Sequence, residues 1–283
     1  MNICSQLSFC RRNAIAASAA LLCLAFVGQQ ARADAPAVTT PTPAAVHVLG
    51  VKTDAKGHLS MGTPLQGVHR IVCLGDSITQ FGDGPMGYVG LIRAYLTTIY
   101  PANTMEVLNA GISGNTSNDE LGRFNSDVLQ KKPDLLTISV GVNDVWHGFD
   151  GTHLLGGGPG GVALDVYRAN VEKMVTGAQA QGCTVVILSP TVISEDLNDP
   201  KNAMVVTYAS ALQDIARTHK CLFVDLERPF QTYIDLYRTT GHTDNLLTGD
   251  GVHMNDWGNR FMAATILSAL TSPAPKTVTL HAP

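Results

Sequence analysis

Short apolar runs alternate with longer stretches of helical periodicity along most of this chain, and that alternation constrains the fold more than any other feature. The strand-like runs are residues 69–74, 105–109, 134–140, 184–189 and 221–225. The helix-like stretches are residues 88–99, 117–130, 163–180, 200–219 and 256–271. Strands that alternate with helices predict a parallel sheet that is covered on both faces and joined by right-handed crossovers. We therefore expect one α/β domain over residues 67–272.

Residues 1–33 have the organisation of a secretory signal and are not expected to belong to the fold. Arg11 and Arg12 precede an uncharged apolar stretch at 14–27, and a small-residue cleavage site ends at Ala33. The apolar stretch is short for a membrane span, so a cleaved signal is favoured over a retained anchor. Cleavage after Ala33 predicts a secreted or periplasmic protein, exported by either the general or the twin-arginine route.

The segments that flank the predicted domain differ from it in composition. Residues 34–66 begin as a linker rich in Ala, Pro and Thr and continue as an extended lead-in, and residues 273–283 form a C-terminal tail. The chain carries 19 Lys and Arg against 23 Asp and Glu, and three of the arginines lie in the signal. An acidic chain without a basic run is not expected to bind nucleic acid or anionic membranes.

The cysteines and a glycine-rich segment are predicted to have structural roles only. Cys73, Cys183 and Cys221 lie outside the signal, each in an apolar run, and buried free thiols are favoured over a Cys183–Cys221 disulfide. The glycine-rich residues 156–161 lack the spacing of a phosphate-binding loop, so we expect a flexible loop near the rim of the site.

The first candidate for chemistry is Ser77. It follows Gly75 and Asp76 directly after the first predicted strand, where a helix is about to begin. A hydroxyl in that position stands clear of the sheet, close to backbone amides that can stabilise developing negative charge. This placement suits a nucleophile, although a serine after a strand is also a common turn or capping residue.

Two further motifs follow the second and third predicted strands. Residues 109–116 contain two glycines that let backbone amides approach a ligand, and Ser113 between them is a competing nucleophile. Residues 141–144 read Gly-Val-Asn-Asp, and the side-chain amide of Asn143 is a neutral donor suited to an oxyanion. An ordinary strand-to-helix turn and an Asx-turn are the respective alternatives.

Residues 250–253 read Asp-Gly-Val-His and precede the last predicted helix. On a turn that Gly251 makes possible, Asp250 can accept a hydrogen bond from the Nδ1–H of His253 and leave Nε2 free as a base. A surface turn is one alternative, and a metal site is a second, disfavoured one. Its ligands would be His242, Asp244, Asp250 and His253.

Together and in this order, the four motifs resemble those of the SGNH, or GDSL-type, hydrolase family. The resemblance covers most of residues 69–270, and the only departure in the first motif is Ile78, where the family commonly has leucine. No Gly-x-Ser-x-Gly sequence is present, which excludes the nucleophile elbow of the α/β-hydrolases. The resemblance implies a flavodoxin-like three-layer α/β/α sandwich around a five-stranded parallel sheet.

The resemblance also assigns roles to individual residues. It implies Ser77 as the nucleophile, His253 as general base and acid, and Asp250 as the residue that orients His253. The oxyanion hole would consist of the backbone N–H groups of Ser77 and Gly114 and the side-chain amide of Asn143. Neither a metal nor any other cofactor is required.

The activity implied is that of an ester hydrolase working through an acyl-enzyme. We favour a short-acyl, acetyl-type esterase acting on a small-molecule or glycan ester, with carbohydrate O-deacetylation as the leading hypothesis. Trp146, His147 and His153 follow the Asn143 motif and could contact a sugar. The alternatives are a lysophospholipase or thioesterase, an O-acyltransferase with the same residues, and a non-catalytic glycan-binding protein; the oligomeric state is left open.

Overall fold

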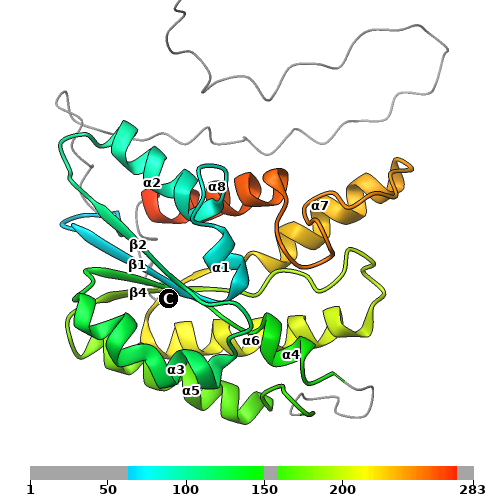
Figure 1. Cartoon of the computed structure of the whole chain (residues 1–283), viewed down its shortest axis with the longest axis horizontal. Helices are drawn as coiled ribbons and strands as arrows, with labels where there is room; N and C mark the ends of the chain where they lie inside the picture. The colour runs from blue at the N-terminus through cyan, green and yellow to red at the C-terminus, as the bar shows by residue number, and fades with distance from the viewer. Residues whose placement is uncertain (1–62, 150–157, 273–283) are drawn as a thin grey trace, which may run out of the picture. The chain divides into compact units, whose positions relative to one another are not determined.

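The computed structural model describes residues 63–149 and 158–272. The predicted signal, the C-terminal tail, nearly all of the lead-in and residues 156–157 of the glycine-rich segment lie outside these residues. Five strands form one sheet in the order β2-β1-β3-β4-β5, and every pairing is parallel, as predicted (Figure 1). The strands are β1 (Arg70–Gly75), β2 (Glu106–Gly111), β3 (Leu135–Ser139), β4 (Thr184–Leu188) and β5 (Leu222–Val224).

Helices cover both faces of this sheet. On one face α3 packs against α5 and α5 against α6, and on the other α2 packs against α8 (Figure 1). The helices are α1 (Ser77–Phe81), α2 (Tyr88–Ile99), α3 (Ser117–Asp127), α4 (Val142–Trp146), α5 (Leu164–Gln179), α6 (Pro200–His219), α7 (Glu227–Thr239) and α8 (Asp256–Thr271), with a 3₁₀ turn at Leu129–Lys131. The arrangement is the predicted three-layer sandwich.

The central strands are apolar because helices cover them on both faces. All residues of β3 are buried, as are all residues of β1 after Arg70. Gly75 at the end of β1 lies opposite Gly111 of β2 and Ser139 of β3. The carboxyl ends of these three strands therefore meet at one edge, where ligands bind in sheets of this kind.

The five predicted helices are present, and α7 was not predicted from the sequence. Its inward face carries Phe230 and Ile234, both fully buried, with Tyr233 and Tyr237 beside them. The spacing of these residues by three and four positions is a helical pattern that is present in the sequence. Within the described ranges, no helix is long and apolar enough to cross a membrane.

The three described cysteines are free thiols, as predicted. Cys73 and Cys183 are buried and Cys221 is partly buried. Burial raises the pKa of Cys73 to about 11, which leaves this thiol protonated and unreactive at neutral pH.

Candidate active site

Ser77 is the first residue of α1 and stands just beyond the end of β1. The carboxylate of Asp76 caps this helix by accepting the backbone N–H of Ile78 at 2.9 Å. A side chain at Gly75 would collide with Thr79 and with the backbone of β3, so the tight strand-to-helix turn requires glycine there. The local sequence thus fixes the serine at the edge of the sheet.

Ser77, His253 and Asp250 form a continuous chain of contacts although 176 positions separate the first two. The Oγ of Ser77 lies 2.8 Å from Nε2 of His253, and Nδ1 of His253 lies 2.7 Å from Oδ2 of Asp250. An Nδ1–H that donates to Asp250 leaves the Nε2 lone pair directed at the serine hydroxyl. The geometry is that of a nucleophile, a base and an orienting acid.

The second oxygen of Asp250 holds the turn itself. Oδ1 accepts the backbone N–H groups of Val252 at 3.0 Å and His253 at 2.7 Å. Burial raises the pKa of Asp250, but these bonds and the bond from the His253 side chain outweigh it, so the pKa lies below its usual value. Asp250 is therefore ionised at neutral pH, and the exposure of 55% of its side chain to water favours the same state.

Ser113, the competing nucleophile, has a different partner. Its backbone N–H and its hydroxyl both donate to Oε1 of Gln80, at 2.8 and 2.6 Å. Because His253 contacts Ser77 instead, the geometry favours Ser77.

Asn143 is 3% exposed and lies in the first turn of α4 rather than on a loop. Its Nδ2 donates to the backbone carbonyl of Asn115 at 2.9 Å, which ties the end of β3 to the loop after β2. In that loop Gly114 has φ +79°, a left-handed conformation that favours glycine, and a Cβ there would have no atom within 4 Å. The predicted oxyanion donors thus lie on adjoining segments, with open space at Gly114.

Arg123 of α3 binds several segments of this edge together, a role that the sequence did not suggest. Its guanidinium donates to the carbonyls of Gly75 at 2.9 Å and Ala110 at 2.8 Å, and to Oδ1 of Asn115 at 2.6 Å. An ion pair with Asp127 at 3.0 Å completes its contacts. The planar, five-donor guanidinium can fix three chain segments at once.

Three buried carboxyl groups, those of Asp76, Glu120 and Asp144, lie near one another beneath this edge. Burial is the largest influence on each and raises the pKa of Asp76 to about 7 and that of Asp144 to about 6. Asp144 also accepts the backbone N–H of Ser117, at 3.0 Å from Oδ1. Only Asp76 and Asp144 belong to motifs that the sequence singled out.

The loop between β4 and α6 supports the turn that carries Asp250, a contact that sequence reasoning missed. Glu195 is 3% exposed and accepts the backbone N–H groups of residues 246–248 at 2.6–2.8 Å. The neighbouring Ser194 donates its backbone N–H to the carbonyl of Gly251 at 2.7 Å. Asp250 and His253 are therefore held by a loop more than fifty residues away.

The remaining predicted site residues are placed as follows. Trp146 ends α4, is 39% exposed, and its ring centroid lies 6.1 Å from that of His147. His153 lies outside the described residues. Among the residues that the structure describes, no group of three or more His, Cys, Asp or Glu side chains could hold a metal ion.

Comparison with known proteins places the chain in a family. The model of the GDSL-like lipase/acylhydrolase family matches residues 73–261. The acetylxylan esterase of Geobacillus stearothermophilus is 30% identical over 210 residues, which cover 70% of this chain and 92% of that enzyme. The chain therefore belongs to the GDSL-like lipase/acylhydrolase family, and it is a carboxylic ester hydrolase.

Solved structures agree with this assignment. The crystal structure of an acetyl xylan esterase is 32% identical and has a TM-score of 0.63, covering 71% of this chain and 99% of that one. The acetylxylan esterase of G. stearothermophilus superposes with a TM-score of 0.61 at 28% identity, covering 71% and 94%. Catalytic mutants of the latter enzyme have been solved with a serine, a histidine or an aspartate replaced by alanine.

Proposed function

We propose that the chain is an acetyl esterase in which Ser77 is the nucleophile, His253 the general base and Asp250 the residue that orients His253. The observation that carries the proposal is the pair of contacts from Ser77 Oγ to His253 at 2.8 Å and from His253 to Asp250 at 2.7 Å. The three residue types mutated in the G. stearothermophilus enzyme support it.

The first half of the reaction forms the acyl-enzyme. Nε2 of His253 takes the hydroxyl proton as Oγ of Ser77 bonds to the ester carbonyl carbon, and the carbonyl electron pair moves onto oxygen. When the carbonyl re-forms, the ester C–O bond breaks and the departing alcohol takes the proton from His253. The acyl group remains on Ser77.

The negative oxygen formed in this step needs hydrogen-bond donors that are already in place. We assign this role to the backbone N–H groups of Ser77 and Gly114 and to the amide of Asn143. The bond from Asn143 to the Asn115 carbonyl fixes that amide before the substrate arrives, so no reorganisation is needed in the transition state.

Water completes the cycle. His253 removes a proton from a water molecule, whose oxygen attacks the acyl carbon, and the tetrahedral intermediate expels Ser77 Oγ. The serine recovers its proton from His253, and the free acid leaves. No step needs a metal or a redox cofactor.

We propose that the substrate is an acetyl ester of a carbohydrate. We also propose that the protein is exported and meets this substrate outside the cytoplasm. Support for an acetyl group comes from two similar proteins: the acetylxylan esterase of G. stearothermophilus, which is 30% identical, and the acetyl xylan esterase of known structure that is 32% identical. Support for export comes from the composition of residues 1–33. N-terminal sequencing of protein from the culture medium or periplasm tests the second point, with cleavage after Ala33 as the expected result.

Two substrate series test the activity. We expect release of acetate from acetylated xylo-oligosaccharides, and a kcat/KM for p-nitrophenyl esters that falls as the acyl chain lengthens. A preference for long acyl chains would identify a lipid acylhydrolase instead, and acyl transfer to an added sugar in preference to water would identify a transferase. Hydrolysis by Ser77→Ala at the wild-type rate would refute the mechanism.

A further inference from the structure

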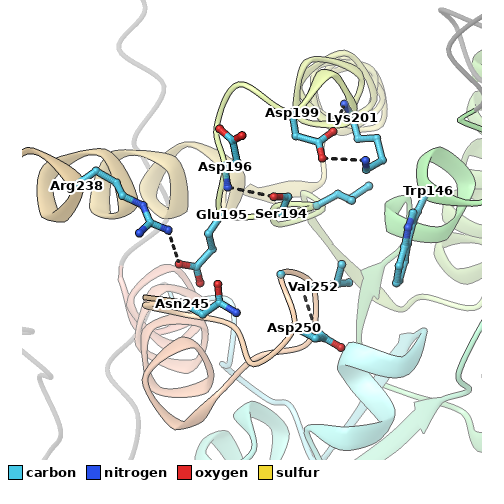
Figure 2. Close-up of a pocket in the computed structure, with 12 residues that line it drawn as sticks. Trp146, Ser194, Glu195, Asp196, Asp199, Lys201, Arg238, Asn245, Asp250 and Val252 are labelled. Carbon is cyan, nitrogen blue, oxygen red and sulfur yellow. Dashed lines mark hydrogen bonds and ion pairs between the residues drawn. The ribbon is translucent and has the colours of Figure 1, made fainter. Parts of the chain in front are cut away.

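A cavity of about 420 Å³ adjoins the catalytic residues on the Asp250 side. Four segments line it: the end of α4 at Trp146, residues 193–201, Arg238 of α7, and residues between 245 and 252, which include Asp250 and Val252 (Figure 2). Helix α4 also carries Asn143, and the turn at Asp250 leads to His253. The cavity therefore adjoins the helix and the turn that carry these two residues, and its volume lies within the size range of small-molecule sites.

Both cationic side chains that line the cavity lie close to a carboxylate. Lys201 pairs with Asp199 at 2.8 Å, and Arg238 approaches Glu195 at 3.8 Å. Asp196 and Asp250 add two more carboxylates, so the lining has more acids than bases. A phosphate or other anionic group would meet no unpaired cation among these residues, whereas a neutral polar ligand would find both donors and acceptors.

Trp146 supplies an aromatic wall in this polar setting. Its side chain stands on one side of the cavity, with Lys201 and Asp199 across the top and Asp250 and Val252 below (Figure 2). An aromatic face combined with a few polar groups is suited to a ligand that is apolar on one surface and polar at its edge. A sugar ring has this character, because its faces carry C–H groups and its rim carries hydroxyls.

We propose that this cavity binds a sugar ring of the substrate, with Trp146 against the ring face and Lys201, Asp196 and Asn245 hydrogen-bonded to its hydroxyls. The inference rests on the proposed function and adds the residues that recognise the alcohol part of the ester. Selectivity for sugar esters then arises in this cavity, separately from the bond-breaking groups.

Binding can be observed through Trp146 itself, since the chain contains only two tryptophans. Trp257→Phe leaves Trp146 as the single tryptophan to be excited, and Trp146→Phe leaves Trp257, which is 55% exposed on α8 with Arg260 over its ring. We expect xylotriose, which lacks an acetyl group, to cause a saturable change of emission in Trp257→Phe and none in Trp146→Phe. The reverse pattern, or no change in either protein, would overturn the proposal.

Kinetics provide the second test, with acetylated xylotriose and p-nitrophenyl acetate compared in each variant. The ratio of interest is kcat/KM for acetylated xylotriose divided by kcat/KM for p-nitrophenyl acetate. Trp146→Ala and Lys201→Met should lower this ratio about tenfold, mainly through a higher KM for the sugar ester. Trp257→Phe is the matched control and should keep the wild-type ratio. An unchanged ratio in both cavity variants would contradict the assignment of the cavity.

The two proposals fail in different ways. A wild-type protein that cleaves p-nitrophenyl acetate but no acetylated sugar would refute the carbohydrate part of the proposed function. A wild-type protein that deacetylates xylotriose esters, with cavity variants that keep the wild-type ratio, would refute only the role of the cavity.

Discussion

Ser77 and Asn143 stand where β1 and β3 end, whereas Asp250 and His253 lie on a turn between α7 and α8 that no strand supports. The first pair is placed by strand register and by glycine at the turn after β1. The second pair is placed by hydrogen bonds to the loop between β4 and α6, in which Glu195 accepts and Ser194 donates. One half of the site is therefore fixed by backbone topology, whereas the other depends on a buried side chain.

The largest effect is expected at the acid of the loop-supported half. Asp250→Asn should lower kcat by up to about 10⁴-fold, because asparagine favours the wrong imidazole tautomer of His253. Asp256→Asn, an exposed aspartate in the first turn of α8, is the control and should keep wild-type kcat. A loss below tenfold in Asp250→Asn would show that His253 is oriented by other groups.

On the strand-supported half, Asn143→Ala should lower kcat by about 10²–10³-fold with a smaller change in KM, because an oxyanion donor acts mainly in the transition state. Steady-state kinetics with p-nitrophenyl acetate measure this split. Asn125→Ala, an exposed asparagine of α3, serves as the control. If the loss appeared in KM alone, Asn143 would be a substrate-binding group and not an oxyanion donor.

Glu195→Gln tests how the loop-supported half is held. The amide NH₂ of glutamine cannot accept the backbone N–H of Leu246, which Oε2 of Glu195 accepts at 2.6 Å, so the turn should shift. We expect kcat to fall about tenfold while KM changes little, since a displacement near 1 Å can cost up to about 10²-fold. Glu172→Gln on α5 should leave both constants unchanged.

A fall in melting temperature with normal kcat in Glu195→Gln would assign Glu195 to stability alone. Normal kcat together with a normal melting temperature would remove the difference between the two halves.

The smallest effect concerns the buried acids beneath the strand-supported half. Because burial raises the pKa of Asp144 to about 6, the folded protein holds a proton there that the unfolded chain loses near pH 4. Binding of this proton stabilises the folded state. The stabilisation is complete below pH 4 and is lost as the pH rises to about 6, and each unit of pKa shift corresponds to about 1.4 kcal/mol in the free energy of unfolding.

Asp144→Asn has no carboxyl group at this position and should not lose this stabilisation as the pH rises. The melting temperature of the variant minus that of the wild type should therefore increase between pH 4 and pH 6 and stay level above pH 7. Thermal unfolding across that range measures the difference. A difference that is independent of pH would show that Asp144 has the same pKa in the folded and unfolded states.

The sequence predicted the half of the site that depends on local pattern. Apolar runs of the right length predicted the strands, and the motifs that contain Ser77, Gly114 and Asn143 follow the ends of β1, β2 and β3. The Asp-x-x-His spacing also predicted the contact between Asp250 and His253, because both partners lie within one turn.

The supporting contacts were out of reach for a physical reason. Arg123 reaches Gly75 across 48 positions, and Glu195 reaches residues 246–248 across 51 to 53. Neither residue stands out locally: the arginine lies in an amphipathic helix and the glutamate in an irregular loop. The partners at these distances in sequence are backbone groups, the Gly75 carbonyl and the N–H groups of residues 246–248, and such groups are the same in every sequence, so only the folded chain reveals the contacts.

The proposed mechanism requires that Ser77 is the residue that becomes acylated. Treatment with a fluorophosphonate, followed by peptide mapping with mass spectrometry, identifies the serine that reacts. We predict a stoichiometric mass increase on the peptide that contains Ser77, no such increase in Ser77→Ala and a much slower one in His253→Ala. Labelling of Ser113, or an active enzyme that carries no label on Ser77, would contradict the account.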